Sequence, residues 1–178
     1  CHEAGGGVVL IPAGKCVRIG TIRLKSYVEL HLERGSRLLL SGNGEDFDKN
    51  DYGTDQRAGI YAADSESIGI TGFGTIDGNG KSYVTERLEA IYHTQKRRPY
   101  VVIFQRCRDI TMKDFTIVDA AVWTIDITRC YNVTVHNINI LNDMLMPNSD
   151  GIDIDRCQFV RISDCHFECG DDCIVLKS

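Results

Sequence analysis

The sequence predicts a parallel β-helix, a solenoid in which short strands stack coil upon coil. Two observations support this fold: a repeated spacing of apolar residues, and a small residue at a fixed distance before each repeat. The chain has 178 residues, 43% of them hydrophobic, which is enough for one continuous core. We therefore expect residues 1–178 to form a single all-β domain.

Four segments share a spacing of two, then three, then two positions between residues expected to face the core. A spacing of two marks one face of a strand, and the step of three adds a residue that turns the chain. The copies begin at positions that differ by 42, 23 and 27, so the repeat contains one large insertion. They are Ile68, Ile70, Phe73, Thr75; Ile110, Met112, Phe115, Ile117; Val133, Val135, Ile138, Ile140; and Val160, Ile162, Cys165, Phe167.

A small residue stands three positions before each copy, at Ser65, Cys107, Cys130 and Cys157. Thiols stacked in a core act as small hydrophobes, so we expect these three cysteines to be free. Cys1 and Cys16 lie outside this ladder and could form a disulfide. The eight cysteines include no CxxC pair and no His at zinc-finger distance, which argues against a metal site.

Residues 81–98 break the strand pattern and are expected to form a surface loop or a short helix over one rim. The segment ends in Lys96, Arg97 and Arg98, which could contact an acidic ligand or form a solvated charged run. A net charge of −5 argues against nucleic-acid binding and offers no bulk attraction to an anionic polymer. No apolar run approaches the roughly 20 residues of a membrane span, so no membrane partner is expected.

A second alignment brings acidic and aromatic residues into one column. DGIDI, which begins at Asp150, matches DCIVL, which begins at Asp172, and steps back of 27 and 23 reach Trp123 and Tyr100. Neighbouring strands lie ~4.8 Å apart, so these four residues should stack along one outer face. Each aromatic ring could stack on a sugar or pack at a rim.

Two stacked aspartates are unfavourable in a structural sheet, which suggests a functional reason for Asp150 and Asp172. Carboxylates that push one another's pKa apart are what a glycosidase needs, with one acid protonated and another ionised. Gly170 permits a bend that turns both Asp171 and Asp172 outward. Spacing alone leaves open a loop that binds backbone amides or Ca²⁺.

NSDG at 148–151 and GDDCIVLKS at 170–178 resemble the first two signature motifs of the polygalacturonase family, glycoside hydrolase family 28. PAGKCVRIGTIRLKSYVELHLERGSRLLL, ITGFGTIDGNG and RPYVVIFQRC resemble the same family, so the likeness covers nearly the whole chain. The resemblance implies a right-handed parallel β-helix that hydrolyses α-1,4-galacturonosyl linkages of pectin with inversion. It implies no cofactor, no metal, a pectic polysaccharide as partner, and an extracellular or periplasmic location.

Carried over to this sequence, the resemblance makes Asp171 the general acid, while Asp150 and Asp172 hold and deprotonate the attacking water. Inversion usually places the acid and base carboxyls roughly 6.5 to 9.5 Å apart. Asn148 would orient the cluster through hydrogen bonds. The residues expected to contact substrate are Asn148, Trp123 and Tyr100. Ser149 replaces the Thr usual in the family and keeps its hydroxyl.

The sequence stops before the Gly-His-Gly and Arg-x-Lys motifs of the family, so we expect a fragment that is incomplete at both ends. The strand at 174–176 would then be an uncapped edge through which the chain could associate. His136 and His166 lie in no matching motif and are expected to be ordinary strand residues. The alternative functions are a rhamnogalacturonan hydrolase, a Ca²⁺-dependent pectate lyase, for which no Arg base can be assigned, and a non-catalytic carbohydrate-binding solenoid.

Overall fold

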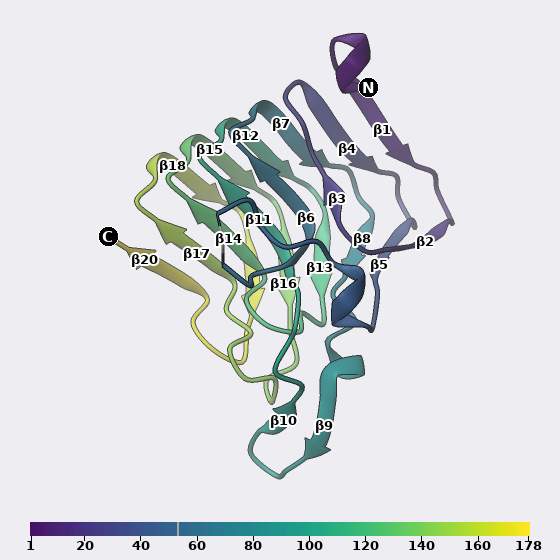
Figure 1. The fold of residues 1–178 in the computed structure, drawn as a ribbon, viewed down its shortest axis with the longest axis vertical. Helices are drawn as coiled ribbons and strands as arrows, with labels where there is room; N and C mark the ends of the chain where they lie inside the picture. Colours follow the sequence, from purple (N-terminus) through teal and green to yellow (C-terminus); the bar gives the residue numbers. More distant parts are fainter. Residues whose placement is uncertain (53) are drawn as a thin grey trace.

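The computed structural model describes residues 1–52 and 54–178, which form short strands wound into successive coils (Figure 1). Within this part of the chain, three parallel sheets of six strands run along the molecule. Each coil contributes one strand to each sheet, and neighbours within a sheet come from successive coils. The expected parallel β-helix is therefore confirmed.

The first sheet contains β1 (Gly7–Ile11), β4 (Val28–Leu32), β7 (Glu66–Thr71), β12 (Arg108–Lys113), β15 (Tyr131–His136) and β18 (Gln158–Ser163). The second contains β2 (Cys16–Ile19), β5 (Arg37–Leu40), β8 (Thr75–Asp77), β13 (Thr116–Val118), β16 (Asn139–Leu141) and β19 (His166–Glu168). The third contains β3 (Ile22–Arg23), β6 (Ala58–Ala63), β11 (Tyr100–Gln105), β14 (Ile125–Thr128), β17 (Ile152–Asp155) and β20 (Ile174–Lys177).

The predicted stacking of the repeats is found in the first sheet. Ile110 pairs with Val133, and Val133 pairs with Val160 on the next coil. The step of three corresponds to a bend between the first and second sheets, where one residue takes a left-handed conformation. Asn and Asp tolerate this conformation best, and they occupy it here at Asp114 (φ 72°), Asn137 (φ 51°) and Asp164 (φ 56°).

The first copy of the repeat departs from the expected spacing. Its bend runs through residues 72–74, one residue longer than the bend at 114–115, so Ile76 rather than Thr75 pairs with Ile117. The extra residue places Phe73 outside the core, 52% exposed, with the Arg34 guanidinium 4.4 Å from its ring centroid. Assigning Phe73 and Thr75 to the core was therefore wrong.

The predicted thiol ladder is confirmed. Cys107, Cys130 and Cys157 are free, and each Sγ donates to the carbonyl two residues earlier, at 3.4 to 3.5 Å. Ser65 makes the same contact through its hydroxyl at 2.9 Å. The neighbouring thiols and burial raise the pKa of Cys130. Cys1 and Cys16 are also free, so the suggested disulfide between them is not formed.

The insertion at 81–98 forms a protruding hairpin (Figure 1), not the expected loop or short helix. The 3-10 helix η3 (Gly80–Tyr83) leads into β9 (Val84–Arg87), which pairs antiparallel with β10 (Tyr92–Thr94). Tertiary contacts hold the segment in this conformation against its local helix propensity. The Tyr92 amide donates to Leu145 O at 2.8 Å, and the buried Tyr83 hydroxyl donates to Ser41 O at 2.8 Å.

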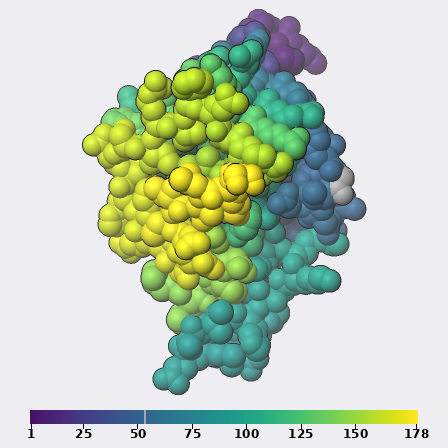
Figure 2. All heavy atoms as spheres, turned by 90° about the vertical axis from the view of Figure 1, so that its left-hand side faces the viewer, coloured from purple at the N-terminus to yellow at the C-terminus, as the bar shows by residue number. Residues whose placement is uncertain are grey.

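Two further 3-10 helices, η1 (His2–Ala4) and η2 (Gly44–Asp46), complete the described elements. Of the helices in residues 1–52 and 54–178, none has the length and apolar character needed to cross a bilayer. The last coil, drawn in yellow, forms the face turned toward the viewer in Figure 2. Its strand β20 leaves Ile174 46% and Leu176 80% exposed.

Candidate active site

Asp150 and Asp172 lie on adjacent coils, each two residues before its strand in the third sheet. Ile152 of β17 pairs with Ile174 of β20, and the Gly151 amide donates to the Asp172 carbonyl at 2.9 Å. The Thr124 amide donates in turn to the Asp150 carbonyl at 2.9 Å. The predicted column therefore exists, with the loop that carries Trp123 one coil before Asp150.

The side chains of Asp150, Asp171 and Asp172 converge. One carboxylate oxygen from each lies within 4.8 Å of the other two. Asp150 is buried, whereas Asp171 and Asp172 are exposed to solvent. Carboxylates in this arrangement can share a proton, position a water, or contact a cation, although Ca²⁺ prefers six to eight oxygen ligands.

Ser149 joins the loop of Asp150 to the loop of Asp171. Its hydroxyl, fully buried, donates to Met146 O at 2.9 Å and accepts from the Gly170 amide at 3.0 Å. A Cβ at Gly170 would lie 2.7 Å from this hydroxyl and 2.9 Å from Met146 O. Glycine is therefore required at position 170 by the closeness of the two loops.

Asp150 has the electrostatics expected of a functional carboxyl. Burial, helped by the neighbouring charges of Asp153 and Asp171, raises its pKa to about 6. Its Oδ1 is buried and has no hydrogen-bond partner among the residues that the structure describes. A buried oxygen that finds no protein partner is suited to bind a group supplied by solvent or substrate.

The orienting role that the sequence suggested for Asn148 belongs to Asn142. Asn148 is exposed, and its Oδ1 lies 3.5 Å from Arg98 Nη2, with no hydrogen bond to the three carboxylates in the described structure. Buried Asn142 holds the loop instead, donating to Thr124 Oγ1 at 2.7 Å and to Ser149 O at 3.1 Å. Sequence reasoning missed Asn142, which stands just after β16.

The two predicted aromatic residues pack against each other and against a lysine. Tyr100 and Trp123 meet edge to face with ring centroids 5.6 Å apart. Lys177 Nζ lies 3.3 Å from the Trp123 centroid and donates to Asp153 Oδ1 at 2.5 Å. One face of Trp123 is therefore occupied by Lys177, so a sugar could stack on the opposite face only.

A row of acidic residues on the outer face of the third sheet was also missed. Asp126 of β14 pairs in register with Asp153 of β17, and both are buried. Desolvation raises the pKa of Asp126 to about 6 and also raises the pKa of Asp153. The sequence held a sign of this pair, because an aspartate stands between two core isoleucines in Ile125-Asp126-Ile127 and again in Ile152-Asp153-Ile154.

The comparisons with known proteins agree with this geometry. The family model described as "Glycosyl hydrolases family 28" matches residues 1–178. The chain belongs to glycosyl hydrolase family 28. A Vitis vinifera member named "Probable polygalacturonase" is 31% identical across 98% of the chain, and a Brassica napus "Polygalacturonase" is 28% identical across 98%. The crystal structure of a hyperthermoactive exopolygalacturonase from Thermotoga maritima has a TM-score of 0.81, with 27% identity over 99% of this chain.

This family 28 chain is much shorter than those relatives. It spans 37% of the Vitis protein, 42% of the Brassica protein and 48% of the Thermotoga chain. The match includes both aspartate-bearing loops and all three sheets. The family membership and the fold are therefore established.

Proposed function

We propose that the protein hydrolyses α-1,4-galacturonosyl linkages of pectic polysaccharide, using Asp150, Asp171 and Asp172. The observation that supports this most is the convergence of three carboxylate oxygens within 4.8 Å, one of them on a buried residue. Glycoside hydrolysis needs one carboxyl as acid and another as base or nucleophile. Membership of family 28 and relatives named polygalacturonase support pectin as the substrate class.

In this proposal Asp171 protonates the leaving oxygen, while Asp150 and Asp172 hold and deprotonate the water. The raised pKa of Asp150, about 6, means that the base is ionised only above mildly acidic pH. The same raised pKa would also suit an acid, so the two roles need a direct test. An aryl galacturonide with a good leaving group needs little protonation. Asp171→Asn should therefore retain more activity on it than on polygalacturonate, and Asp150→Asn should not.

The proposal of inversion comes from the family and not from the spacing. One carboxylate oxygen of each aspartate lies within 4.8 Å of the others, so the three carboxyls can share one water, and the stereochemical outcome is tested on the product. Proton NMR of the first product decides the outcome. Inversion of an α-linkage gives the β-anomer first, whereas the α-anomer would indicate retention.

A polymer of pectic size is met outside the cytoplasm, and we propose an extracellular or periplasmic location for the protein. The proposed activity is tested by incubating the full-length protein with polygalacturonate. Release of reducing ends, without an ultraviolet-absorbing unsaturated product and with unchanged rate in a chelator, supports hydrolysis. An unsaturated product that requires Ca²⁺ would indicate β-elimination, and binding without cleavage would indicate a non-catalytic solenoid.

A further inference from the structure

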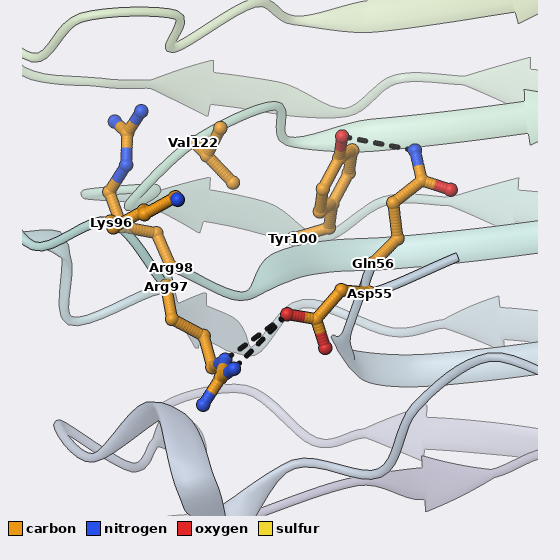
Figure 3. Close-up of a pocket in the computed structure, with 7 residues that line it drawn as sticks. All are labelled: Asp55, Gln56, Lys96, Arg97, Arg98, Tyr100 and Val122. Carbon is orange, nitrogen blue, oxygen red and sulfur yellow. Dashed lines mark hydrogen bonds and ion pairs between the residues drawn. The ribbon is translucent and has the colours of Figure 1, made fainter. Parts of the chain in front are cut away.

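A cationic cavity lies beside the carboxylate cluster, on the side of the earlier coils. It encloses about 630 Å³, within the range of small-ligand sites, and is lined by Asp55, Gln56, Lys96, Arg97, Arg98, Tyr100 and Val122 (Figure 3). The lining includes three cations and one carboxylate, in a chain whose net charge is −5. The cavity is thus a local exception to the charge of the molecule.

The three cations differ in how far their charges are neutralised. Arg97 is bound to Asp55 at 3.2 Å and also contacts Glu45. The half-buried Arg98 donates to the carbonyls of Ala121 and Pro147, each at 2.8 Å, so it makes neutral contacts only. Lys96 is exposed and has no acidic partner among the described residues.

Lys96 and Arg98 both keep a charge without an acidic partner among the described residues, and of the two only Lys96 also lacks a hydrogen-bond partner there. Figure 3 shows Arg97 directed toward Asp55, whereas Lys96 extends toward the space between Val122 and Tyr100. The opposite wall of the cavity can contact a sugar ring. Tyr100 presents its aromatic ring there, and its hydroxyl accepts a hydrogen bond from Gln56 Nε2 at 3.1 Å. An ammonium facing an aromatic and amide wall can hold a sugar that carries a carboxylate.

The cavity is placed to hold a sugar next to the one that reacts. Tyr100 is the first residue of β11, two strands from β17 in the third sheet, so its position is about 10 Å from that of Asp150 along the stack. The Tyr100 and Trp123 rings, 5.6 Å apart, bridge the interval. A bound polymer can therefore occupy the cavity and the carboxylate cluster together.

We propose that this cavity is a binding subsite for the carboxylate of a uronic acid residue, with Lys96 as the residue that recognises the charge. The inference rests on the proposed function, because it names the sugar class held beside the reacting linkage. It also assigns Lys96 to ligand binding and not to a solvated charged run. Arg97 and Arg98 instead contact groups of the protein.

The test measures binding of trigalacturonate and of its methyl ester by calorimetry, in the full-length protein carrying Asp171→Asn to prevent turnover. Lys96→Gln should weaken binding of the acid about three- to tenfold and leave binding of the ester unchanged, since only the acid carries the charge. Lys96→Arg should bind the acid as the parent does. Lys15→Gln, which alters an exposed lysine at the turn before β2, is the matched control and should have no effect.

Unchanged binding of the acid by Lys96→Gln, equal weakening of acid and ester, or no binding of trigalacturonate to the parent would each overturn the subsite. These results are separate from the catalytic proposal. Hydrolysis of polygalacturonate with unaltered binding in Lys96→Gln rejects the subsite alone. Charge-dependent binding without hydrolysis supports the subsite and rejects the activity.

Discussion

The amide of Gly170 donates a hydrogen bond to Ser149 Oγ at 3.0 Å, and this bond ties the loop of Asp171 to the loop of Asp150. Both aspartates are one residue from the bond along the chain. The hydroxyl also donates to Met146 O, so the fully buried Ser149 side chain satisfies a donor on one loop and an acceptor on the other. We therefore expect this buried hydroxyl to help fix the relative placement of the two carboxylates.

Ser149→Ala should lower the free energy of unfolding by about 1–3 kcal/mol, because it leaves the Gly170 amide and Met146 carbonyl unsatisfied. It should also lower kcat more than it raises KM, since the carboxylates lose their fixed spacing. Ser149→Thr keeps the hydroxyl and should retain most activity. Denaturant unfolding and steady-state kinetics of both variants check this, and an unaffected Ser149→Ala would show that the hydroxyl does not position the loops.

Asp126 should make the protein less stable as pH rises. Its carboxyl has a folded-state pKa of about 6 against an ordinary 3.8, so the folded state binds more protons between these values. The associated stability is fully present below about pH 4 and is lost as pH rises through 6. The raised pKa of Asp150 likewise makes the protein less stable as pH rises.

Asp126→Asn should remove part of this loss and stabilise the protein at pH 7, by up to about 3 kcal/mol, with little effect at pH 4. The amide oxygen can still accept from Thr128 Oγ1, which lies 3.0 Å from Asp126 Oδ1. Thermal unfolding at both pH values is the measurement. Equal effects at pH 4 and pH 7 would mean that Asp126 is not titrating between them.

Lys177 should contribute more to stability than a lysine in an exposed surface pair such as Lys113. It neutralises Asp153, whose side chain is only 1% exposed, and covers Trp123. Lys177→Met should cost about 2–4 kcal/mol at pH 7, because it leaves a buried carboxylate without its cation. Lys113→Met removes a half-exposed partner 3.7 Å from Asp114 and should cost under about 1 kcal/mol. Similar losses in the two variants would refute this role for Lys177.

The sequence was sufficient to predict that the coils stack, because each coil repeats the same spacing of apolar residues. Ile110, Val133 and Val160 could be aligned without a structure, and the same alignment placed Asp150 over Asp172. The extra residue that places Phe73 outside the core has a signal in the sequence that the spacing rule ignored, because this bend is Gly72-Phe73-Gly74 whereas the two-residue bends begin with Asp114, Asn137 and Asp164.

The contacts that complete the site come from side chains on other coils, and no periodic pattern reports them. Asn142 reaches two loops, and Lys177 reaches back one coil to Asp153. Arg98 and Lys96 likewise could not be told apart in the sequence. Only the structure shows that Arg98 donates to two backbone carbonyls. The local sequence shows where each charged residue stands along its coil, but it does not show which group neutralises that charge.

The most direct test of the catalytic proposal is the kcat of Asp171→Asn on polygalacturonate, measured by release of reducing ends. Loss of general acid help should lower kcat about 10²- to 10⁴-fold without a change in thermal unfolding. Asp164→Asn is the matched control, because it alters an exposed aspartate at a bend where Asn accepts the same left-handed conformation. We expect the loss in Asp171→Asn alone, and a turnover near that of the parent would assign the acid to another residue.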